Sequence, residues 1–175
     1  MFALPPLVQR PPELMDDPSL DAGQHEEAIR ALARIHVVSR TASQIASHLV
    51  SLSQKVSPTA ADPLRIIDIA CGGGELTIAV AQRVARTVPH RVEFIGLDIS
   101  ERVIGWATQK HTLANEHLDV SFQTCDVLNG ALPSCTLAFH SLFLHHLDDG
   151  QAVTQLQAMA AASVSYTHLT LPTKA

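Results

Sequence analysis

Three consecutive glycines directly after a short apolar run constrain the fold of this chain more than any other feature. Residues 64–70 read LRIIDIA, and Gly72, Gly73 and Gly74 follow, ahead of a segment with helical spacing. An apolar run of this length is typical of a strand buried on both faces of a parallel sheet. Glycines after such a strand let the backbone turn sharply and approach a ligand closely. The pattern predicts a strand–turn–helix unit.

Strand and helix patterns alternate along the remainder of the chain. We expect strands over residues 64–70, 92–98, 120–125 and 136–141. Helices are expected over 76–85, from residue 101 with Ser100 as the N-cap, and from Asp148 or Asp149 to residue 162. Alternating strands and helices imply parallel strands with right-handed crossovers. The predicted fold class is therefore α/β, an open parallel sheet with N-terminal helices.

Four segments are expected along the chain. Residues 1–21 are proline-rich and acidic and predict an extended N-terminal arm. Residues 22–57 predict an N-terminal helical cap, either one helix or two helices broken near residues 39–41. Residues 58–163 predict a partial catalytic domain, and residues 164–175 are expected to be a non-native tail.

Composition limits the class of protein. The chain has 175 residues, 46% hydrophobic and 17% charged, which is typical of a globular domain. Its net charge of -5 and its scattered lysines and arginines argue against nucleic acid as a partner. Three cysteines suit a reducing compartment, and we find neither a membrane-spanning run nor a signal peptide. We therefore expect a cytoplasmic protein with no membrane partner; the oligomeric state stays open.

Acidic residues at the strand ends indicate what the glycine turn binds. The open amides at a helix N-terminus attract a carboxylate or a phosphate. Asp98 ends the next predicted strand, where an acid accepts hydrogen bonds from both ribose hydroxyls of a nucleotide cofactor. A dinucleotide site expects a third glycine where this chain has Thr77. Asp68 and Glu75 beside the turn disfavour a pyrophosphate but pair with an amino group, which favours S-adenosylmethionine.

Four segments, in order, resemble the motifs of class I S-adenosylmethionine-dependent methyltransferases. They are IIDIACGGGELT, FIGLDIS, FQTCDVL and LAFHSLFLHHLDD, and the resemblance covers residues 64–163. Residues 12–40 are also similar to a subgroup of small-molecule methyltransferases. The resemblance implies methyl transfer from S-adenosylmethionine to a small-molecule acceptor, in a chain truncated before its sheet is complete. It also implies that the α/β sheet is Rossmann-like, with strand order 3-2-1-4 and its later strands missing.

The resemblance also implies roles for individual residues. The amino-acid part of the cofactor would be held by Asp68 and by the turn of Cys71, Gly72, Gly73 and Gly74. Asp98 would hold the ribose, Ile99 would pack on the adenine, and Asp126 and Val127 would frame it. Ser141 lies in the fourth motif, along the methionine end of the cofactor.

The acidic residues also have a plain structural interpretation. Asp68 would then only cap the following helix, and Asp98 and Asp126 would be ordinary strand-end acids. Arg40 would either reach the cofactor carboxylate or an acidic acceptor, or be a solvated charge at a helix end. Both interpretations stay open at this stage.

Catalytic residues are unknown from the sequence. The adjacent His145 and His146 are weak candidates for a general base, although packing is the favoured role. Cys71 is interpreted as a small turn residue and not as a nucleophile. The histidines show no ligand pair with a cysteine or carboxylate partner, so no metal is expected.

The last residues carry a second resemblance. Residues 164–173, VSYTHLTLPT, resemble the in-frame translation of a transposase-type sequencing-library adapter, and segments of that kind are excluded from fold reasoning. The alternative is a genuine fifth strand, since YTHLTL is β-branched and alternating. If the tail is not native, the fourth predicted strand is an exposed edge.

Two other functions stay open beside the small-molecule methyltransferase. One is an oxidoreductase with a nucleotide cofactor, against which Thr77 and the two acids count. The other is an inactive cofactor-binding fragment. The acceptor atom is not determined, because oxygen, nitrogen and carbon acceptors all use this scaffold.

Overall fold

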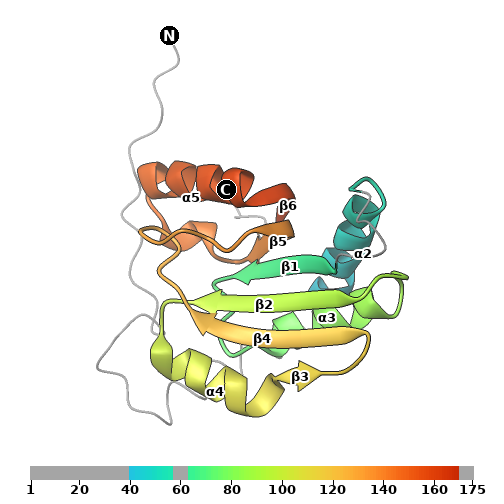
Figure 1. Ribbon diagram of the computed structural model, residues 1–175. Helices are drawn as coiled ribbons and strands as arrows, with labels where there is room; N and C mark the ends of the chain where they lie inside the picture. The colour runs from blue at the N-terminus through green and yellow to red at the C-terminus, as the bar shows by residue number, and fades with distance from the viewer. Residues whose placement is uncertain (1–39, 57–62, 170–175) are drawn as a thin grey trace.

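The computed structural model describes residues 40–56 and 63–169 of the chain (Figure 1). The predicted arm, the part of the predicted helical cap before residue 40 and the end of the tail lie outside these residues. The described elements are α2 (Thr41–Ser53), β1 (Leu64–Ile69), α3 (Glu75–Ala85), β2 (Val92–Asp98), α4 (Glu101–His111), β3 (Leu113–Ala114), β4 (Leu118–Thr124), β5 (Cys135–Ser141), η2 (Leu144–His146), α5 (Asp149–Ala162) and β6 (Ser163–Leu169). Among them no helix is long and apolar enough to cross a membrane.

A single sheet runs in the order β3-β4-β2-β1-β5-β6. Strand β1 pairs in parallel with β2 on one side and with β5 on the other, and β2 pairs in parallel with β4. The four predicted strands therefore stand in the expected order 3-2-1-4, all parallel. Their carboxyl ends meet at one edge of the sheet, where ligands bind in open α/β folds.

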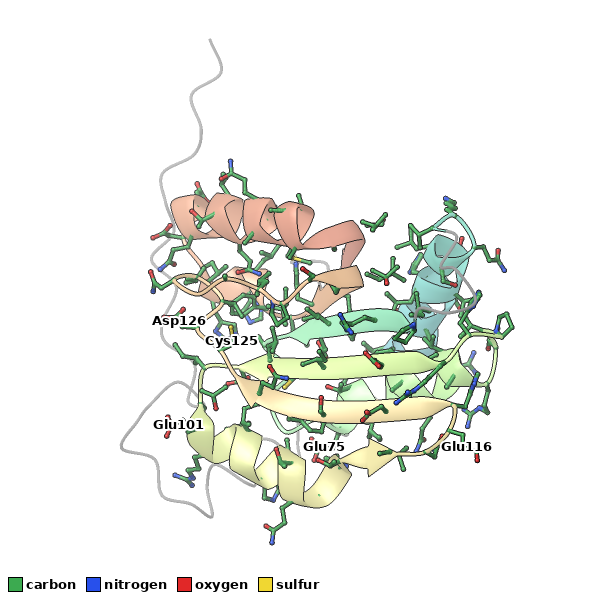
Figure 2. All side chains as sticks on the ribbon, viewed as in Figure 1. Glu75, Glu101, Glu116, Cys125 and Asp126 are labelled. Atoms are coloured by element: carbon green, nitrogen blue, oxygen red, sulfur yellow. The ribbon has the colours of Figure 1, made fainter. Side chains whose placement is uncertain are left out.

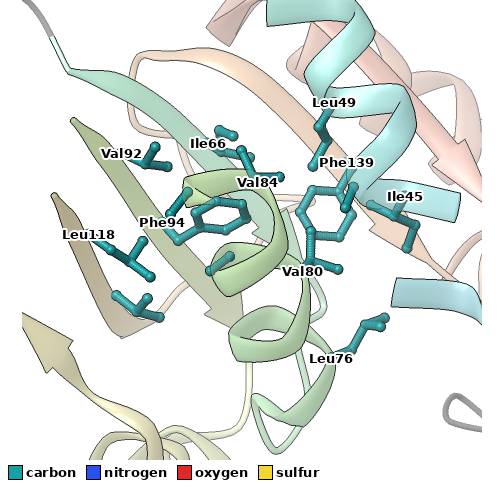
Figure 3. Close-up of a cluster of buried hydrophobic side chains, with 14 of the residues drawn as sticks. Ile45, Leu49, Ile66, Leu76, Val80, Val84, Val92, Phe94, Leu118 and Phe139 are labelled. Atoms are coloured by element: carbon teal, nitrogen blue, oxygen red, sulfur yellow. The ribbon is translucent and has the colours of Figure 1, made fainter. Parts of the chain in front are cut away.

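Helices cover both faces of the sheet (Figure 1). Alternate residues of β1 point to opposite faces, so Ile66 joins the core under α2, α3 and α4, while Ile67 joins the core under α5. Figure 3 shows the larger core, in which Phe94 and Phe139 meet edge to face with ring centroids 6.5 Å apart. A strand buried on both faces accounts for the continuous apolar run LRIIDIA.

Side-chain caps begin two of the helices where the sequence predicts them. The Ser100 hydroxyl accepts a hydrogen bond from the Val103 amide at 3.3 Å and begins α4. Asp148 begins α5 through a capping box, in which its carboxylate accepts from the Gln151 amide and the Gln151 side chain accepts from the Asp148 amide. Both caps satisfy amides that have no partner inside the helix.

Strand β3 is a feature that the sequence analysis missed. Its two residues pair antiparallel with β4 through a turn at Asn115, whose side-chain oxygen accepts from the amides of His117 and Leu118 at 3.0 and 2.9 Å. Two residues carry no periodicity, so no pattern signals such a strand. The other predicted boundaries differ from the structure by at most two residues.

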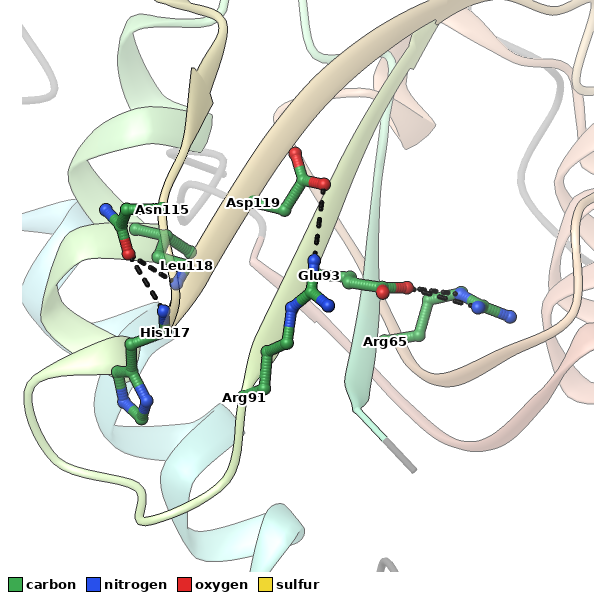
Figure 4. Close-up of polar contacts among 7 residues, drawn as sticks. All are labelled: Arg65, Arg91, Glu93, Asn115, His117, Leu118 and Asp119. Carbon is green, nitrogen blue, oxygen red and sulfur yellow. Dashed lines mark hydrogen bonds and ion pairs between the residues drawn. The ribbon is translucent and has the colours of Figure 1, made fainter. Parts of the chain in front are cut away.

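Two ion pairs lie near the amino ends of β1, β2 and β4 (Figure 4). Arg65 on β1 pairs with Glu93 on β2 at 3.1 Å, and Arg91 pairs with Asp119 on β4 at 3.8 Å. Arg65, Glu93 and Asp119 alternate with core residues and therefore project from the face opposite α3. Partly exposed pairs of this kind contribute roughly 0–1 kcal/mol each.

Strand β6 includes most of the predicted tail. Residues 163–169 pair in parallel with β5, so in this chain the fourth predicted strand is not the edge of the sheet; the exposed edge was expected only for a chain without the tail. The β-branched, alternating composition of this run suits an edge strand, which is the alternative weighed above.

The origin of residues 164–175 stays a prediction. If they are a non-native tail, resequencing the source DNA by an adapter-free method will replace the codons from Val164 onward, while the codons for residues 64–163 will return unchanged as the internal control. Recovery of the same ten codons for residues 164–173 from native DNA would contradict the prediction.

Gln155 on α5 is a buried polar residue with an energetic cost. Its side chain is fully buried, and neither its Oε1 nor its Nε2 has a hydrogen-bond partner in the described part of the chain. One turn later, Met159 packs in the core under α5, so Gln155 lies on the same helix face. An unpaired buried amide is destabilising.

Replacing this amide is expected to stabilise the fold. Gln155→Met keeps the side-chain length and removes both unpaired groups, so the free energy of unfolding should rise by about 1 kcal/mol. Urea unfolding measures the change, and Gln157→Met on the exposed side of the same helix is the control. A loss of stability in Gln155→Met, with Gln157→Met unchanged, would show that the amide is paired.

Candidate cofactor-binding site

The turn after β1 adopts a backbone conformation that its sequence makes possible. Ala70, Gly72 and Gly74 all have positive φ angles, of 57°, 54° and 84°. The turn is anchored by two backbone hydrogen bonds, from the Cys71 amide to the Leu97 carbonyl at 2.9 Å and from the Gly74 amide to the Cys71 carbonyl at 3.2 Å. Gly74 is the N-cap of α3, so the turn places the open amides of that helix at the carboxyl edge of the sheet.

The two outer glycines of the turn face different surroundings. A Cβ built on Gly72 would meet no atom within 4 Å, whereas one built on Gly74 would lie 2.7 Å from the ring of Phe122. Gly72 therefore borders open space and Gly74 borders a packed aromatic ring. Of these two positions, Gly72 is the one where the missing side chain leaves room for a ligand.

Asp98 links the turn to the end of β2. One oxygen of its carboxylate accepts a hydrogen bond from the Gly72 amide at 3.0 Å, and the other accepts from the Ser100 amide at 3.0 Å. Asp98 therefore has a structural role, because its carboxylate binds these two backbone amides. Each carboxylate oxygen has a second lone pair, so two further donors, such as two hydroxyls, can still bind.

Asp68 is buried beneath α3. Its side chain accepts a hydrogen bond of 2.6 Å from the Thr77 hydroxyl, and the residue is 2% exposed. Burial raises the pKa of the Asp68 carboxyl to about 7; the Thr77 hydrogen bond opposes this rise, and the nearby Asp98 charge adds to it. The structure thus connects Asp68 to a side chain of the helix and not to the helix amides. Thr77, which donates this hydrogen bond to Asp68, stands where a dinucleotide site has its third glycine.

Glu75 pairs with α4, whereas the sequence predicts that its charge faces the glycine turn. Its carboxylate lies 3.4 Å from Lys110 Nζ and 3.8 Å from His111 Nε2, both at the end of α4. Because Glu75 pairs with α4 and Asp68 has a pKa near neutrality, neither acid places a full, unpaired charge at the turn. The repulsion of a pyrophosphate is weaker than expected, and Thr77 is the stronger observation against a dinucleotide.

Cys71 is buried in the turn. Burial, with the charges of Asp68 and Asp98, raises the pKa of its thiol far above the ordinary value. A thiol that stays protonated is not a nucleophile. This agrees with the interpretation of Cys71 as a small turn residue.

Residues after β2 and β4 complete the carboxyl edge. Figure 2 shows Cys125, Asp126 and Glu101 at this edge, and Glu116 at the opposite one. Ile99 is 68% exposed, whereas Val127 is buried in the α5 core. The Asp126 carboxylate accepts from the Asn129 side chain at 2.9 Å and from the Leu128 and Asn129 amides, and these hydrogen bonds lower its pKa. Asp126 therefore shapes its own loop.

The end of β5 brings another polar group to the edge. The Ser141 hydroxyl is buried without a hydrogen-bond partner in the described part of the chain. His145 and His146 follow in η2 with ring centroids 4.1 Å apart; His145 is half-buried and His146 is exposed. Within residues 40–56 and 63–169, no three histidine, cysteine or acidic side chains gather in a way that holds a metal ion.

Arg40 stands at the start of α2. It is the N-cap residue of that helix and is exposed. Helix α2 ends at Ser53, eleven residues before β1 begins, and packs against α3. The structure describes no contact between the Arg40 side chain and the glycine turn, so its role stays a prediction.

The contacts of two residues of the site were not predicted from the sequence. Thr77 was noted only as a missing glycine, although an acid and a threonine nine residues apart across a strand–turn–helix unit are a usable signal for their hydrogen bond. Phe122 gave no signal, because its contact with the turn depends on which strands are neighbours.

Comparison with known proteins identifies the family. The sequence profile of a family described as methyltransferase domain matches residues 66–163. No curated protein sequence matches the chain. Its fold is similar to magnesium protoporphyrin IX methyltransferase of Synechocystis PCC 6803 with bound SAM, at 20% identity and a TM-score of 0.55, over 86% of this chain and 64% of that one.

Two further solved structures have a similar fold. The plantazolicin methyltransferase BpumL in complex with SAH is 16% identical with a TM-score of 0.60, over 85% of this chain and 54% of that one. Human N-acetylserotonin methyltransferase in complex with SAM is 19% identical with a TM-score of 0.54, over 81% and 35%. The matched part of this chain thus spans less than two thirds of the length of each of these proteins.

The fold and the turn define a Rossmann-like α/β domain with a cofactor edge at the carboxyl ends of its parallel strands. The profile match covers more than half of the chain and begins inside β1. The chain belongs to the methyltransferase domain family.

The buried acid predicts a pH-dependent stability. An unfolded Asp68 loses its proton near pH 3.8, whereas the folded one keeps it to about pH 7. The group therefore favours folding fully below pH 3.8, and this contribution is lost as the pH rises to 7. Relative to Asp68→Asn, whose amide does not titrate, the wild-type chain should lose on the order of 4 kcal/mol of unfolding free energy across this window.

Urea unfolding at several pH values measures the difference between the two chains. Asp119→Asn, on the partly exposed Arg91 pair, is the matched control and should follow the wild-type pH profile. Parallel profiles for wild type and Asp68→Asn would show that the carboxyl titrates normally.

Proposed function

We propose that this protein transfers a methyl group from S-adenosylmethionine to a small-molecule acceptor. One observation carries the proposal. Within the segment that matches the methyltransferase domain family, the Asp98 carboxylate accepts a hydrogen bond of 3.0 Å from the Gly72 amide, beside the open space over Gly72. A ribose-binding acid is thereby held beside a glycine turn at the carboxyl edge, as a nucleoside cofactor requires.

Three features of the edge fit this cofactor. The open space over Gly72 has room for its amino-acid part, and the open amides of α3 suit its carboxylate. Ile99 offers an exposed apolar surface for a purine ring. The buried Ser141 hydroxyl has a free hydrogen-bonding group that a ligand can satisfy.

The proposed roles follow these positions. The turn of Cys71, Gly72, Gly73 and Gly74, with Asp68 behind it, holds the amino-acid part, and Asp98 holds the ribose. Ile99, Asp126 and Val127 frame the adenine, and Ser141 lies toward the methionine end. Asp68 acts from beneath the turn, because it is buried and bonded to Thr77.

The cofactor, when bound, supplies an activated methyl group on a sulfonium. The chain's own task is to orient that group toward the acceptor and to exclude water. Where the acceptor loses a proton, His145 and His146 in η2 are the candidates to take it, since an imidazole titrates near neutral pH. Their role and that of Arg40 are proposals that variants of each residue will test.

The acceptor is proposed as a small molecule, on the resemblance of the N-terminal stretch to small-molecule methyltransferases. We place the protein in the cytoplasm, because Cys71, Cys125 and Cys135 are all free. A nucleotide-cofactor oxidoreductase is disfavoured by Thr77, whose hydroxyl binds Asp68 where a dinucleotide site needs a glycine. An inactive cofactor-binding fragment is separated from an enzyme by a turnover assay.

Removing the ribose-binding acid is expected to weaken the cofactor. Asp98→Ala should lower S-adenosylmethionine affinity by roughly 1–3 kcal/mol, because the donors that face the carboxylate lose their partner. Titration calorimetry with S-adenosylmethionine, S-adenosylhomocysteine and NAD on the wild-type and variant chains measures this.

Asp119→Ala removes a carboxylate from the Arg91 pair near the amino end of β4 and is the control. Unchanged S-adenosylmethionine affinity in a folded Asp98→Ala chain would remove Asp98 from the site. Tight binding of NAD without binding of S-adenosylmethionine would favour the oxidoreductase.

A further inference from the structure

The ring of Phe122 occupies the space that two glycines leave open. A Cβ on Gly74 would lie 2.7 Å from its Cε1 and Cζ, and a Cβ on Gly96 would lie 2.6 Å from its Cδ1. Real Cβ atoms do not approach other atoms this closely, so neither position admits a side chain while the ring is there. Phe122, on β4, therefore packs against both β2 and the glycine turn.

The sheet register explains this reach. Phe122 on β4 is the register partner of Gly96 on β2, and Gly96 in turn is the partner of Asp68 on β1. Because Gly96 has no side chain, the ring passes over β2 and reaches the turn that follows β1. Ala107 on α4 lies 3.4 Å from the same Gly74 position and forms another side of the contact.

Apart from Cys71, which packs in the core, the residues of the turn provide little packing of their own. Its three glycines have no side chains, and its backbone bonds run to Leu97, Asp98 and Cys71. These bonds hold the β2 side of the turn. On the α4 side, the ring of Phe122 lies directly against Gly74, the residue from which α3 begins.

We propose that Phe122 is a positioning residue for cofactor binding. Its ring sets the place of Gly74, and thereby directs the open amides of α3 and the Gly72 amide toward the carboxyl edge. The ring is 8% exposed and lies in the core under α3 and α4, so it acts through the turn and not by contact with the cofactor. This inference rests on the proposed function, since the affinity that it governs is that for S-adenosylmethionine.

A matched pair of variants separates positioning from general stability. Phe122→Leu removes Cε1 and Cζ, the atoms that meet Gly74, and Phe94→Leu makes the same change in the same core on β2. With S-adenosylhomocysteine in calorimetry, affinity should fall about tenfold in Phe122→Leu and stay within about twofold in Phe94→Leu, since small displacements of a binding element are costly. Equal affinities in the two folded variants would overturn the proposal.

A double variant tests the contact itself. Gly74→Ala places a methyl group against the ring, and Phe122→Leu removes the atoms that it meets, so the clash is relieved when both are present. The strain of alanine at φ 84° remains in either background. We expect the double variant to bind S-adenosylhomocysteine more tightly than the two single losses combined predict. Strictly additive losses would show that Phe122 and Gly74 act independently.

Hydrogen exchange keeps the inference distinct from the proposed function. Amides of residues 72–77 should exchange faster in Phe122→Leu than in Phe94→Leu, without any ligand. If the wild-type chain binds neither S-adenosylmethionine nor S-adenosylhomocysteine, the proposed function fails, and faster exchange in Phe122→Leu still supports the ring's control of the turn. Equal exchange in the two variants would overturn that control.

Discussion

The burial of β1 on both faces is the constraint on which the rest of the structure depends. Its side chains alternate between the core under α3 and the core under α5, and its neighbours β2 and β5 satisfy its backbone on both edges. A strand held in this way ends inside the protein and must reverse within a few residues. The positive φ angles at Ala70, Gly72 and Gly74 are the result, and they place a helix N-terminus at the cofactor edge.

The same burial determines the electrostatics of the edge. Asp68 lies in β1 on the side of α3 and is desolvated there, so its pKa rises, and the Thr77 hydroxyl compensates it by a hydrogen bond. Glu75, the first residue of α3, turns its charge to Lys110. Asp98 keeps its carboxylate at the turn, bonded to two backbone amides. Of the three acids near the glycines, Asp98 is therefore the one that keeps its carboxylate at the turn, which supports its proposed role in binding a ribose.

Much of this was predictable from local patterns. The parallel strands follow from strand–helix alternation, their order β4-β2-β1-β5 follows from the family resemblance, and the caps at Ser100 and Asp148 follow from residue type and spacing. The pairing of Glu75 was not predictable, because it depends on where α4 ends relative to α3. The two-residue strand β3 was missed, since it carries no periodic signal, whereas the alternating run in β6 left a fifth strand as one of two alternatives.

The sequence by itself determined the strand–turn–helix unit, the acids at the strand ends and the family to which the chain belongs, because each of these depends on residues that are close along the chain. The tertiary structure alone decided which acid is buried, which is paired, and which glycine faces a ring instead of open space. Gly72 and Gly74 are two residues apart and identical in type, yet Phe122 reaches only Gly74. The physical reason is that this contact crosses two neighbouring strands, and a contact between segments distant in sequence exists only once the sheet has formed.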